Sequence, residues 1–264
     1  MIIDMHTHCF PDRLASRAIA ALQQVGELPA YHDGTAADLA RKTRLAGIDL
    51  AVVQPIATKP EQTPTINRWA QNLGDPVLLG FGTLHPGYAD WADEVNWLQQ
   101  QGFRGIKFHP EYQQFFVDDE RYFPIYEAVF QAGMVILFHA GADIAYEEPF
   151  HGTPQRLAHI VDTFPDGRII AAHMGGYRFW TDVERCLIGR HIWLDTSFGL
   201  PELGPRRMVT MMRNHGLDRI LFGSDAPWSD QATALAGIRS LDLTPAEQAA
   251  VLGGNATRLL GLPG

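Results

Sequence analysis

Histidines that follow short apolar runs are the most distinctive chemical feature of this sequence. His6 and His8 come after the run that opens the chain, and their spacing of two residues would place both side chains on one face of a strand. His139, His173 and Asp225 each follow a later apolar run directly or within a few residues. Imidazole nitrogens and carboxylate oxygens are common zinc ligands, and buried polar side chains are costly without such a partner. The five residues therefore predict a divalent metal site.

Four further residues near these histidines are candidates for contact with a substrate. His109 follows an apolar run, and either a second metal ion or the substrate would suit its imidazole. Lys107 lies two residues earlier and one layer deeper; alternatively, a carbamylated lysine there would bridge two metal ions. Glu111 fits three roles: a metal ligand, a proton donor or a surface residue. Arg178 would hold a substrate carboxylate, or it is a surface arginine.

Other catalytic chemistries leave no motif in the sequence. The G-x-S-x-G elbow of serine hydrolases is absent, and the residues around Ser197 read Asp-Thr-Ser-Phe-Gly. Neither a Walker A sequence nor a G-x-G-x-x-G phosphate loop occurs. Several histidines fall in predicted helices or loops, where we expect them on the surface: His32, His151, His159, His191 and His215.

The predicted metal site requires elements whose ends meet, and the sequence contains eight short apolar runs that alternate with helical segments. These runs are apolar on both faces, as buried parallel strands are, and they cover residues 2–5, 51–56, 78–83, 105–108, 134–138, 168–172, 192–195 and 219–222. Eight strands and their helices in 264 residues are typical of the α/β class, and of a (β/α)8 TIM barrel in particular. A doubly wound sheet is the alternative, but it usually has fewer strands and a glycine-rich turn after the first.

Helical periodicity and capping residues mark the segments between these runs. Trp91, Val95 and Leu98 form one apolar stripe, and residues 244–247 read as a capping box that opens the last helical region. Thr153 and Pro154 resemble a helix start. No repeat and no glycine- or proline-rich linker divides the chain, so we predict a single domain over residues 1–264.

Composition limits the partners of this chain. Lysine and arginine number 21 and aspartate and glutamate 30, so the net charge is −9, opposite to the usual balance of a nucleic-acid binder. No stretch approaches the roughly 18 apolar residues of a membrane span, and no signal peptide is recognisable. Two cysteines are too few for a disulfide framework. We therefore expect a cytoplasmic protein that acts on a small molecule, without nucleic-acid or membrane partners.

The ordered set of candidate ligands resembles that of the amidohydrolase superfamily. The phrases IIDMHTH, GIKFHP, HMGG, LFGSDAPW and GNATRLLGL resemble its amidohydrolase-related branch, which includes aminocarboxymuconate-semialdehyde decarboxylase, and they span residues 2–262. This resemblance implies a distorted TIM barrel with one divalent ion, usually Zn²⁺, although other divalent metals are possible. It implies His6, His8, His139 and Asp225 as ligands and His173 as the histidine that orients water or substrate. Proteins of this family often form homodimers, so a homodimer is a further expectation.

Two reactions fit this site. In the first, metal-activated water attacks an amide, lactone or ester carbonyl of a small molecule, and Asp225 and His173 are the catalytic residues. The alternative is a non-oxidative decarboxylase that acts on an unsaturated or aromatic carboxylic acid. In either reaction we expect substrate contacts from Lys107, His109, Glu111 and Arg178. The decarboxylases of the branch are typically longer than this chain, which favours hydrolysis.

Overall fold

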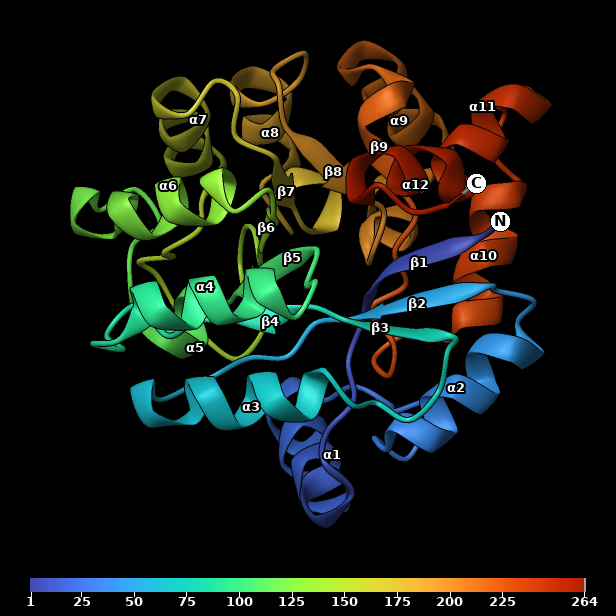
Figure 1. Cartoon of the computed structure of the whole chain (residues 1–264). Helices are drawn as coiled ribbons and strands as arrows, with labels where there is room; N and C mark the ends of the chain where they lie inside the picture. The colour runs from blue at the N-terminus through green and yellow to red at the C-terminus, as the bar shows by residue number, and fades with distance from the viewer. Residues whose placement is uncertain (264) are drawn as a thin grey trace. The chain divides into compact units, whose positions relative to one another are not determined.

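The computed structural model describes residues 1–263, in which parallel strands alternate with helices (Figure 1). The chain divides into two compact units. The terminal unit comprises Met1–Gln54, Asn72–Gly80 and Asp195–Gly264, and the central unit comprises Pro55–Gln71 and Phe81–Leu194. Both units combine strands with helices, so each is described by itself.

The strands of the terminal unit carry the first candidate ligands. Strands β1 (Ile3–Thr7), β2 (Leu50–Val53) and β3 (Leu78–Gly80) form a parallel sheet in that order. Strand β9 (Ile220–Leu221) continues into residues that bond to β1, because the Met5 amide donates to the Phe222 carbonyl at 2.8 Å. The carboxyl ends of β1 and β9 therefore lie side by side.

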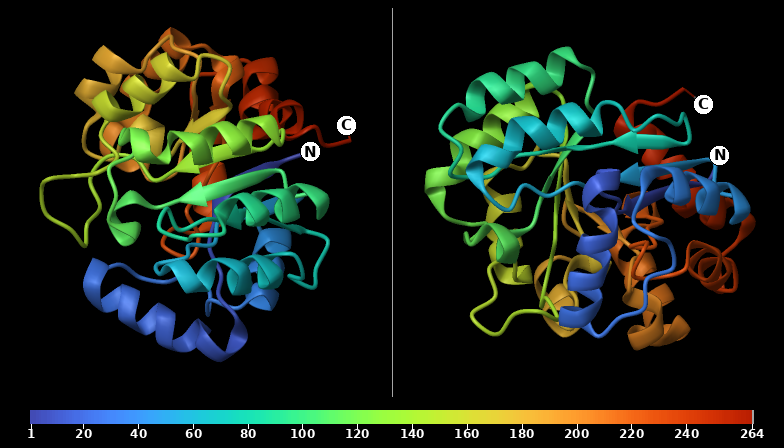
Figure 2. Two further views of the ribbon diagram at one scale, coloured as in Figure 1. Left: turned by 60° about the vertical axis from the view of Figure 1, so that its left-hand side comes forward. Right: turned by 90° about the horizontal axis from the view of Figure 1, so that it is seen from below.

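Within residues 1–263, the terminal unit also contains six helices, two of which, α2 and α12, contact its strands. They are α1 (Asp12–Gly26), α2 (Ala36–Leu45), α9 (Gly199–His215), α10 (Gln231–Arg239), α11 (Pro245–Ala249) and α12 (Asn255–Leu260), with short helical turns at Leu217–Arg219 and Ala250–Gly254. Helix α2 contacts β2 and α10, and the red helix α12 lies against the start of the blue strand β1 (Figure 2). The capping box predicted at residues 244–247 is present at the start of α11.

The central unit contains the other strands. Strands β4 (Gly82–Thr83), β5 (Gly105–Phe108), β6 (Val135–Phe138) and β7 (Ile169–Ala171) pair in parallel and in order, and β7 pairs with β8 (Trp193–Asp195). Its helices are α3 (Thr63–Ala70), α4 (Trp91–Gln100), α5 (Pro110–Gln113), α6 (Phe123–Gln131), α7 (Pro154–Thr163) and α8 (Trp180–Cys186), with turns at Pro60–Gln62, Glu120–Tyr122 and His173–Gly175. The side chains of β5, β6 and β7 are buried throughout.

All eight apolar runs contain strands, but one of them is interrupted. The run 78–83 forms β3 and β4, and Phe81 lies between them. The Phe81 ring occupies the space above Gly105, where an added Cβ would lie 2.4 Å from the ring. The packing of this ring, which hydropathy alone does not encode, accounts for the break.

Burial corrects the expectation that five histidines lie on the surface. His32 and His215 are only 6% and 1% exposed, whereas His159 and His191 are exposed and His151 is half-buried. Among residues 1–263, no helix is both long and apolar enough to cross a membrane. The division into two compact units does not test the prediction of a single domain. That statement therefore stays a prediction.

Candidate functional site

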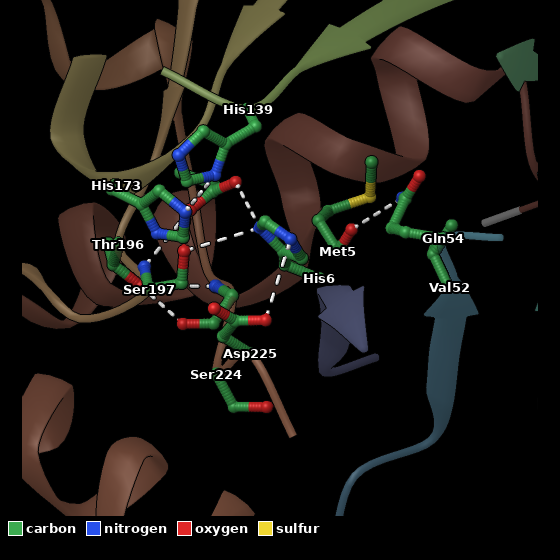
Figure 3. A network of polar contacts seen from close by, with 12 residues as sticks. Met5, His6, Val52, Gln54, His139, His173, Thr196, Ser197, Ser224 and Asp225 are labelled. Atoms are coloured by element: carbon green, nitrogen blue, oxygen red, sulfur yellow. Dashed lines mark hydrogen bonds and ion pairs between the residues drawn. The ribbon is translucent and has the colours of Figure 1, made fainter. Parts of the chain in front are cut away.

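Three of the predicted ligands come together in the terminal unit, at the carboxyl ends of β1 and β9. Nε2 of His8 lies 3.0 Å from Oδ1 of Asp225, and Nε2 of His6 lies 3.6 Å from the same oxygen. Figure 3 shows the side chains of His6 and Asp225 directed toward one another. The planes of the two imidazoles make an angle of 62°, so their Nε2 atoms point toward a common region. We refer to His6, His8 and Asp225 as the terminal triad.

The other ring nitrogens fix the tautomers of the two histidines. Nδ1 of His8 lies 2.8 Å from the backbone carbonyl of Gln54, which can only accept a hydrogen bond, so this nitrogen carries the proton. Nδ1 of His6 lies 2.9 Å from the Asp195 carboxylate, which accepts in the same way when ionised. Both Nε2 atoms therefore present lone pairs to Asp225. Such a partner on the far nitrogen is the usual support of a metal-bound histidine.

The terminal triad fits a cation on its own chemistry. Two imidazole lone pairs and a carboxylate oxygen are all acceptors, so their approach within 3.0–3.6 Å requires a positive charge, either a bound cation or a proton on one of the rings. All three side chains are largely buried, which strengthens that requirement. Two nitrogens and one oxygen at converging angles match the donor set of a divalent transition metal.

The backbone holds Asp225 in an uncommon conformation. Its φ of 66° lies in the left-handed region, and its amide donates to the His6 carbonyl at 2.7 Å. Two residues earlier, an added Cβ on Gly223 would lie 3.0 Å from the Cβ of His6, so glycine lets the segment before Asp225 approach β1 closely. This strain at a candidate ligand is typical of functional sites.

A network of buried polar side chains surrounds the residues next to the terminal triad. The buried Asp4 carboxylate accepts hydrogen bonds from the Ser224 hydroxyl at 2.5 Å and from the Gln231 amide at 2.9 Å. Burial raises the pKa of Asp4 to about 6, although these hydrogen bonds lower it. The Ser197 hydroxyl donates to Asp195 and lies 3.3 Å from Nδ1 of His6. These contacts fix the loop that carries Asp225 and the end of β1 that carries His6.

A second cluster of histidines lies in the central unit. Nε2 of His173 is 3.1 Å from Nδ1 of His139, and Nε2 of His139 is 3.3 Å from the Ala142 carbonyl. Nε2 of His109 is 3.3 Å from the Asp143 carboxylate. The predicted five-residue set is thus divided between the units, and the fourth-ligand role of His139 stays a prediction. Both of its nitrogens have partners within the central unit.

The rings of this cluster are stacked. His109 lies face to face with Tyr112 at 3.8 Å and with His139 at 4.2 Å, and the two histidine planes differ by only 14°. Burial, with the neighbouring His109 and His173, holds the pKa of His139 well below its usual range. Nε2 of His139 lies 3.9 Å from the same Asp143 oxygen that Nε2 of His109 approaches, so this cluster also offers two imidazoles and a carboxylate, with its rings stacked.

Two loops of the central unit are joined where His139 and His173 emerge. The Tyr177 amide donates to the Ala140 carbonyl at 2.9 Å, and the Ala142 amide donates to the Tyr177 carbonyl at 2.9 Å. Gly141, with φ of 88°, permits this approach, because an added Cβ would lie 2.2 Å from the Tyr177 nitrogen. The Trp180 indole donates to the His173 carbonyl at 3.1 Å. His173 itself has a φ of 58°.

The candidate substrate contacts differ in their surroundings. Lys107 is fully buried in β5, whereas Arg178 is exposed and lies 5.1 Å from the centre of the Tyr177 ring. Glu111 is 1% exposed; its Oε1 accepts from the His151 amide at 2.8 Å, and its Oε2 has no hydrogen-bond partner among the described residues. Burial raises the pKa of Glu111 to about 7. Glu111 is therefore no surface residue.

Sequence reasoning missed two carboxylates of these clusters. Asp195, which accepts from His6, ends the predicted strand 192–195, and that position at a strand end was the available signal. Asp143 lies in an irregular loop after β6, where no periodicity or motif marks it. His32 was missed because it lies in a turn whose burial depends on segments distant in sequence.

Comparisons with known proteins agree with this description. The sequence model of the amidohydrolase family matches residues 3–262. Similar solved structures include the 5-carboxyvanillate decarboxylase of Sphingomonas paucimobilis, with 15% identity and a TM-score of 0.71 over 99% of each chain. A 2,6-dihydroxybenzoate decarboxylase has 15% identity and a TM-score of 0.74 over 99% of each chain. A probable 2-pyrone-4,6-dicarboxylic acid hydrolase of Acinetobacter baumannii has 17% identity and a TM-score of 0.68, also over 99% of each chain.

The solved structures support the fold class, and the sequence model supports the family. A search of curated proteins found no match. The solved structures confirm the predicted α/β fold of the TIM-barrel class. The family match covers nearly the whole chain, as the motif resemblance implied. This chain therefore belongs to the amidohydrolase family, as an enzyme of the amidohydrolase superfamily.

Proposed function

We propose that this chain is a metal-dependent carboxy-lyase that removes a carboxyl group from a small aromatic or unsaturated carboxylic acid. The observation that carries the proposal is the convergence of His6 Nε2, His8 Nε2 and Asp225 Oδ1. Several structures with this fold are named as decarboxylases of hydroxylated benzoates, and these names support the choice of reaction. The alignments span 99% of those chains.

The terminal triad would hold the metal ion. Its nitrogen-rich donor set suits zinc, whereas manganese is bound in the structure of the 5-carboxyvanillate decarboxylase of Novosphingobium aromaticivorans, so both are candidates. The family resemblance adds His139 as a fourth ligand. A divalent cation in this position supplies a Lewis acid that fixes a substrate oxygen anion and offsets its charge.

The chain's own residues orient the ligands and hold a proton. Asp195 and the Gln54 carbonyl fix the His6 and His8 rings through their Nδ1 atoms. In the central unit, Nε2 of His173 and Nδ1 of His139 share one hydrogen bond, and we assign to His173 the proton that replaces the carboxyl group. The carbon–carbon bond breaks, carbon dioxide leaves, and the electron pair that remains on carbon takes this proton. Lys107, His109, Glu111 and Arg178 are the proposed substrate contacts.

Product analysis tests the proposal. The purified protein, loaded with zinc or manganese, is incubated with a panel of hydroxylated benzoates and unsaturated dicarboxylic acids, and released carbon dioxide is measured. We expect release with at least one acid, and none from the Asp225→Asn variant. If no acid loses carbon dioxide while a lactone or amide is cleaved by the same preparation, the carboxy-lyase assignment is wrong.

Hydrolysis of a small lactone, ester or amide is the second candidate. A probable 2-pyrone-4,6-dicarboxylic acid hydrolase shares the fold, which favours a lactone over the other hydrolytic substrates. In this reaction Asp225 would accept the proton of the attacking water and pass it to the leaving group. Turnover in ¹⁸O-labelled water separates the reactions, because hydrolysis places one label in the product carboxylate and decarboxylation places none.

A further inference from the structure

A turn after α1 lies against both loops that carry the terminal triad. The Tyr31 amide donates to the Pro227 carbonyl at 2.8 Å, two residues after Asp225. The Phe10 amide donates to the Gly34 carbonyl at 2.8 Å, two residues after His8. The segment 31–34 is therefore held at both ends beside the triad, and His32 is inside it.

The His32 side chain has a hydrogen-bond donor without an acceptor. Its Nδ1 accepts from the Gly34 amide at 3.0 Å, so the proton of the neutral ring is on Nε2. The side chain is buried, and within residues 1–263 its Nε2 has no hydrogen-bond partner. Buried donors in folded proteins nearly always find a partner, so an orphaned one at a candidate site indicates a ligand.

The surroundings of His32 keep its imidazole uncharged at neutral pH. Burial lowers the pKa of His32 to about 4; the charges of Asp38 and Asp33 raise it, and those of His8 and Lys42 lower it further. His8 and His32 are thus close enough to influence each other. Around neutral pH, His32 offers one N–H donor and no positive charge.

A cation bound at His32 itself does not explain the orphaned nitrogen. Asp33 and Asp38 lie beside it, but Oδ1 of Asp33 and both oxygens of Asp38 accept hydrogen bonds. Oδ1 of Asp33 accepts from the Thr35 amide and hydroxyl. Asp38 accepts from Arg41 and from the Asp33 amide. These bonds close the turn before α2, and none of them involves Nε2 of His32.

We propose that the Nε2–H of His32 donates a hydrogen bond to an anionic oxygen of the ligand bound at the terminal triad. His32 is then a binding residue that selects oxygen anions, such as carboxylates, over neutral metal ligands. This inference rests on the proposed metal site. It extends that site to a residue outside the predicted set, supplied by a different loop.

Two probes of different chemistry test the proposal on the metal-loaded full chain. Acetohydroxamate presents an oxygen anion to a metal, whereas imidazole presents a neutral nitrogen and needs no donor nearby. In His32→Leu we expect acetohydroxamate to bind at least about 10-fold more weakly, with imidazole binding and metal content unchanged. In His32→Gln, whose amide can accept from Gly34 and donate in place of Nε2–H, we expect acetohydroxamate binding within about 3-fold of wild type. His215→Gln, a buried histidine that precedes β9 at the end opposite Asp225, is the matched control.

Each contrary result has a distinct meaning. Equal acetohydroxamate affinity in wild type and His32→Leu overturns the proposal. Equal weakening of both probes assigns His32 a structural role and also overturns it. A wild-type holoenzyme that binds metal but not acetohydroxamate contradicts the oxyanion subsite alone. A wild-type chain that binds no metal overturns the proposed function, and this inference with it.

Discussion

Two histidine clusters of similar composition differ in the orientation of their rings. In the terminal unit, His6 and His8 meet at 62° and direct their Nε2 atoms to one oxygen of Asp225. In the central unit, His109 and His139 are stacked at 14°, near Asp143. Both sets bring two imidazoles and a carboxylate within reach of a cation. In both clusters the two Nε2 atoms lie near one carboxylate oxygen, at 3.6 and 3.0 Å from Asp225 and at 3.3 and 3.9 Å from Asp143. The clusters differ in the stacking of the rings and in the partners of the ring nitrogens.

The partners of the ring nitrogens reinforce the difference. His6 and His8 use Nδ1 for Asp195 and for a main-chain carbonyl, which leaves both Nε2 lone pairs directed to the triad. His139 uses Nδ1 for His173 and Nε2 for Ala142. A ligand role for His139 therefore requires it to give up one of these partners. The comparison predicts unequal effects of matched substitutions in the two clusters.

The largest effect is expected at the carboxylates. Asp225→Asn removes the charge on which both Nε2 atoms converge, and we expect turnover to fall by at least about 10³-fold, with the fold retained by circular dichroism. The matched variant Asp143→Asn should keep its metal content. If Asp143→Asn loses metal and Asp225→Asn does not, the assignment of the two clusters is reversed.

Substitution of the histidines should show which cluster binds the metal ion, through the number of ions bound per chain. We expect plasma mass spectrometry to find about one divalent ion per wild-type chain, and close to none after His6→Ala and His8→Ala together. His109→Ala should leave the content unchanged. His139→Ala decides the fourth ligand, because metal loss would confirm the role that the family resemblance gives it. Two ions per wild-type chain would contradict the assignment of a single metal site to the terminal triad.

Glu111, in the central unit, should make the stability of the folded protein depend on pH. Burial raises the pKa of Glu111 from 4.5 to about 7, so the folded state holds this proton more tightly than the unfolded chain. Its contribution to stability is therefore full below about pH 4.5 and is lost as the pH rises through about 7. Glu111→Gln stays neutral, and we expect its stability relative to wild type to rise by up to about 3 kcal/mol across this interval.

Urea unfolding at several pH values measures this difference. Glu147→Gln, at an exposed glutamate of the same unit, is the matched control and should not reproduce the gain. A stability difference between Glu111→Gln and wild type that is constant with pH would show that Glu111 has the same pKa in the folded and unfolded chain.

The smallest predicted effect concerns the support of His6. Asp195→Asn replaces the carboxylate that accepts from Nδ1, and loss of such a partner typically weakens metal binding by about 10–100-fold. Ser197→Ala, which removes the hydroxyl beside the same nitrogen, should have less effect. Competition with a chromophoric chelator measures both affinities. Unchanged affinity in Asp195→Asn would mean that the ring is held by packing alone.

Much of this architecture was predictable because buried parallel strands and alternating side chains leave periodic signals. The eight runs, the shared face of His6 and His8, and the position of Asp225 follow from such local patterns. Asp143 and His32 were not predictable, since their burial depends on backbone bonds between distant segments. The orientation of stacked and converging rings was also hidden, because side-chain rotation leaves no trace in composition or spacing.

The partner of His8 has an evolutionary consequence. Its Nδ1 is fixed by the main-chain carbonyl of Gln54, whereas the Nδ1 of His6 is fixed by the side chain of Asp195. A point mutation at codon 195 can delete the second partner, but no single codon change deletes a peptide carbonyl. The orientation of His8 is therefore robust to substitutions at residue 54 that preserve the backbone path. The orientation of His6 remains open to genetic drift and to selection for a different metal.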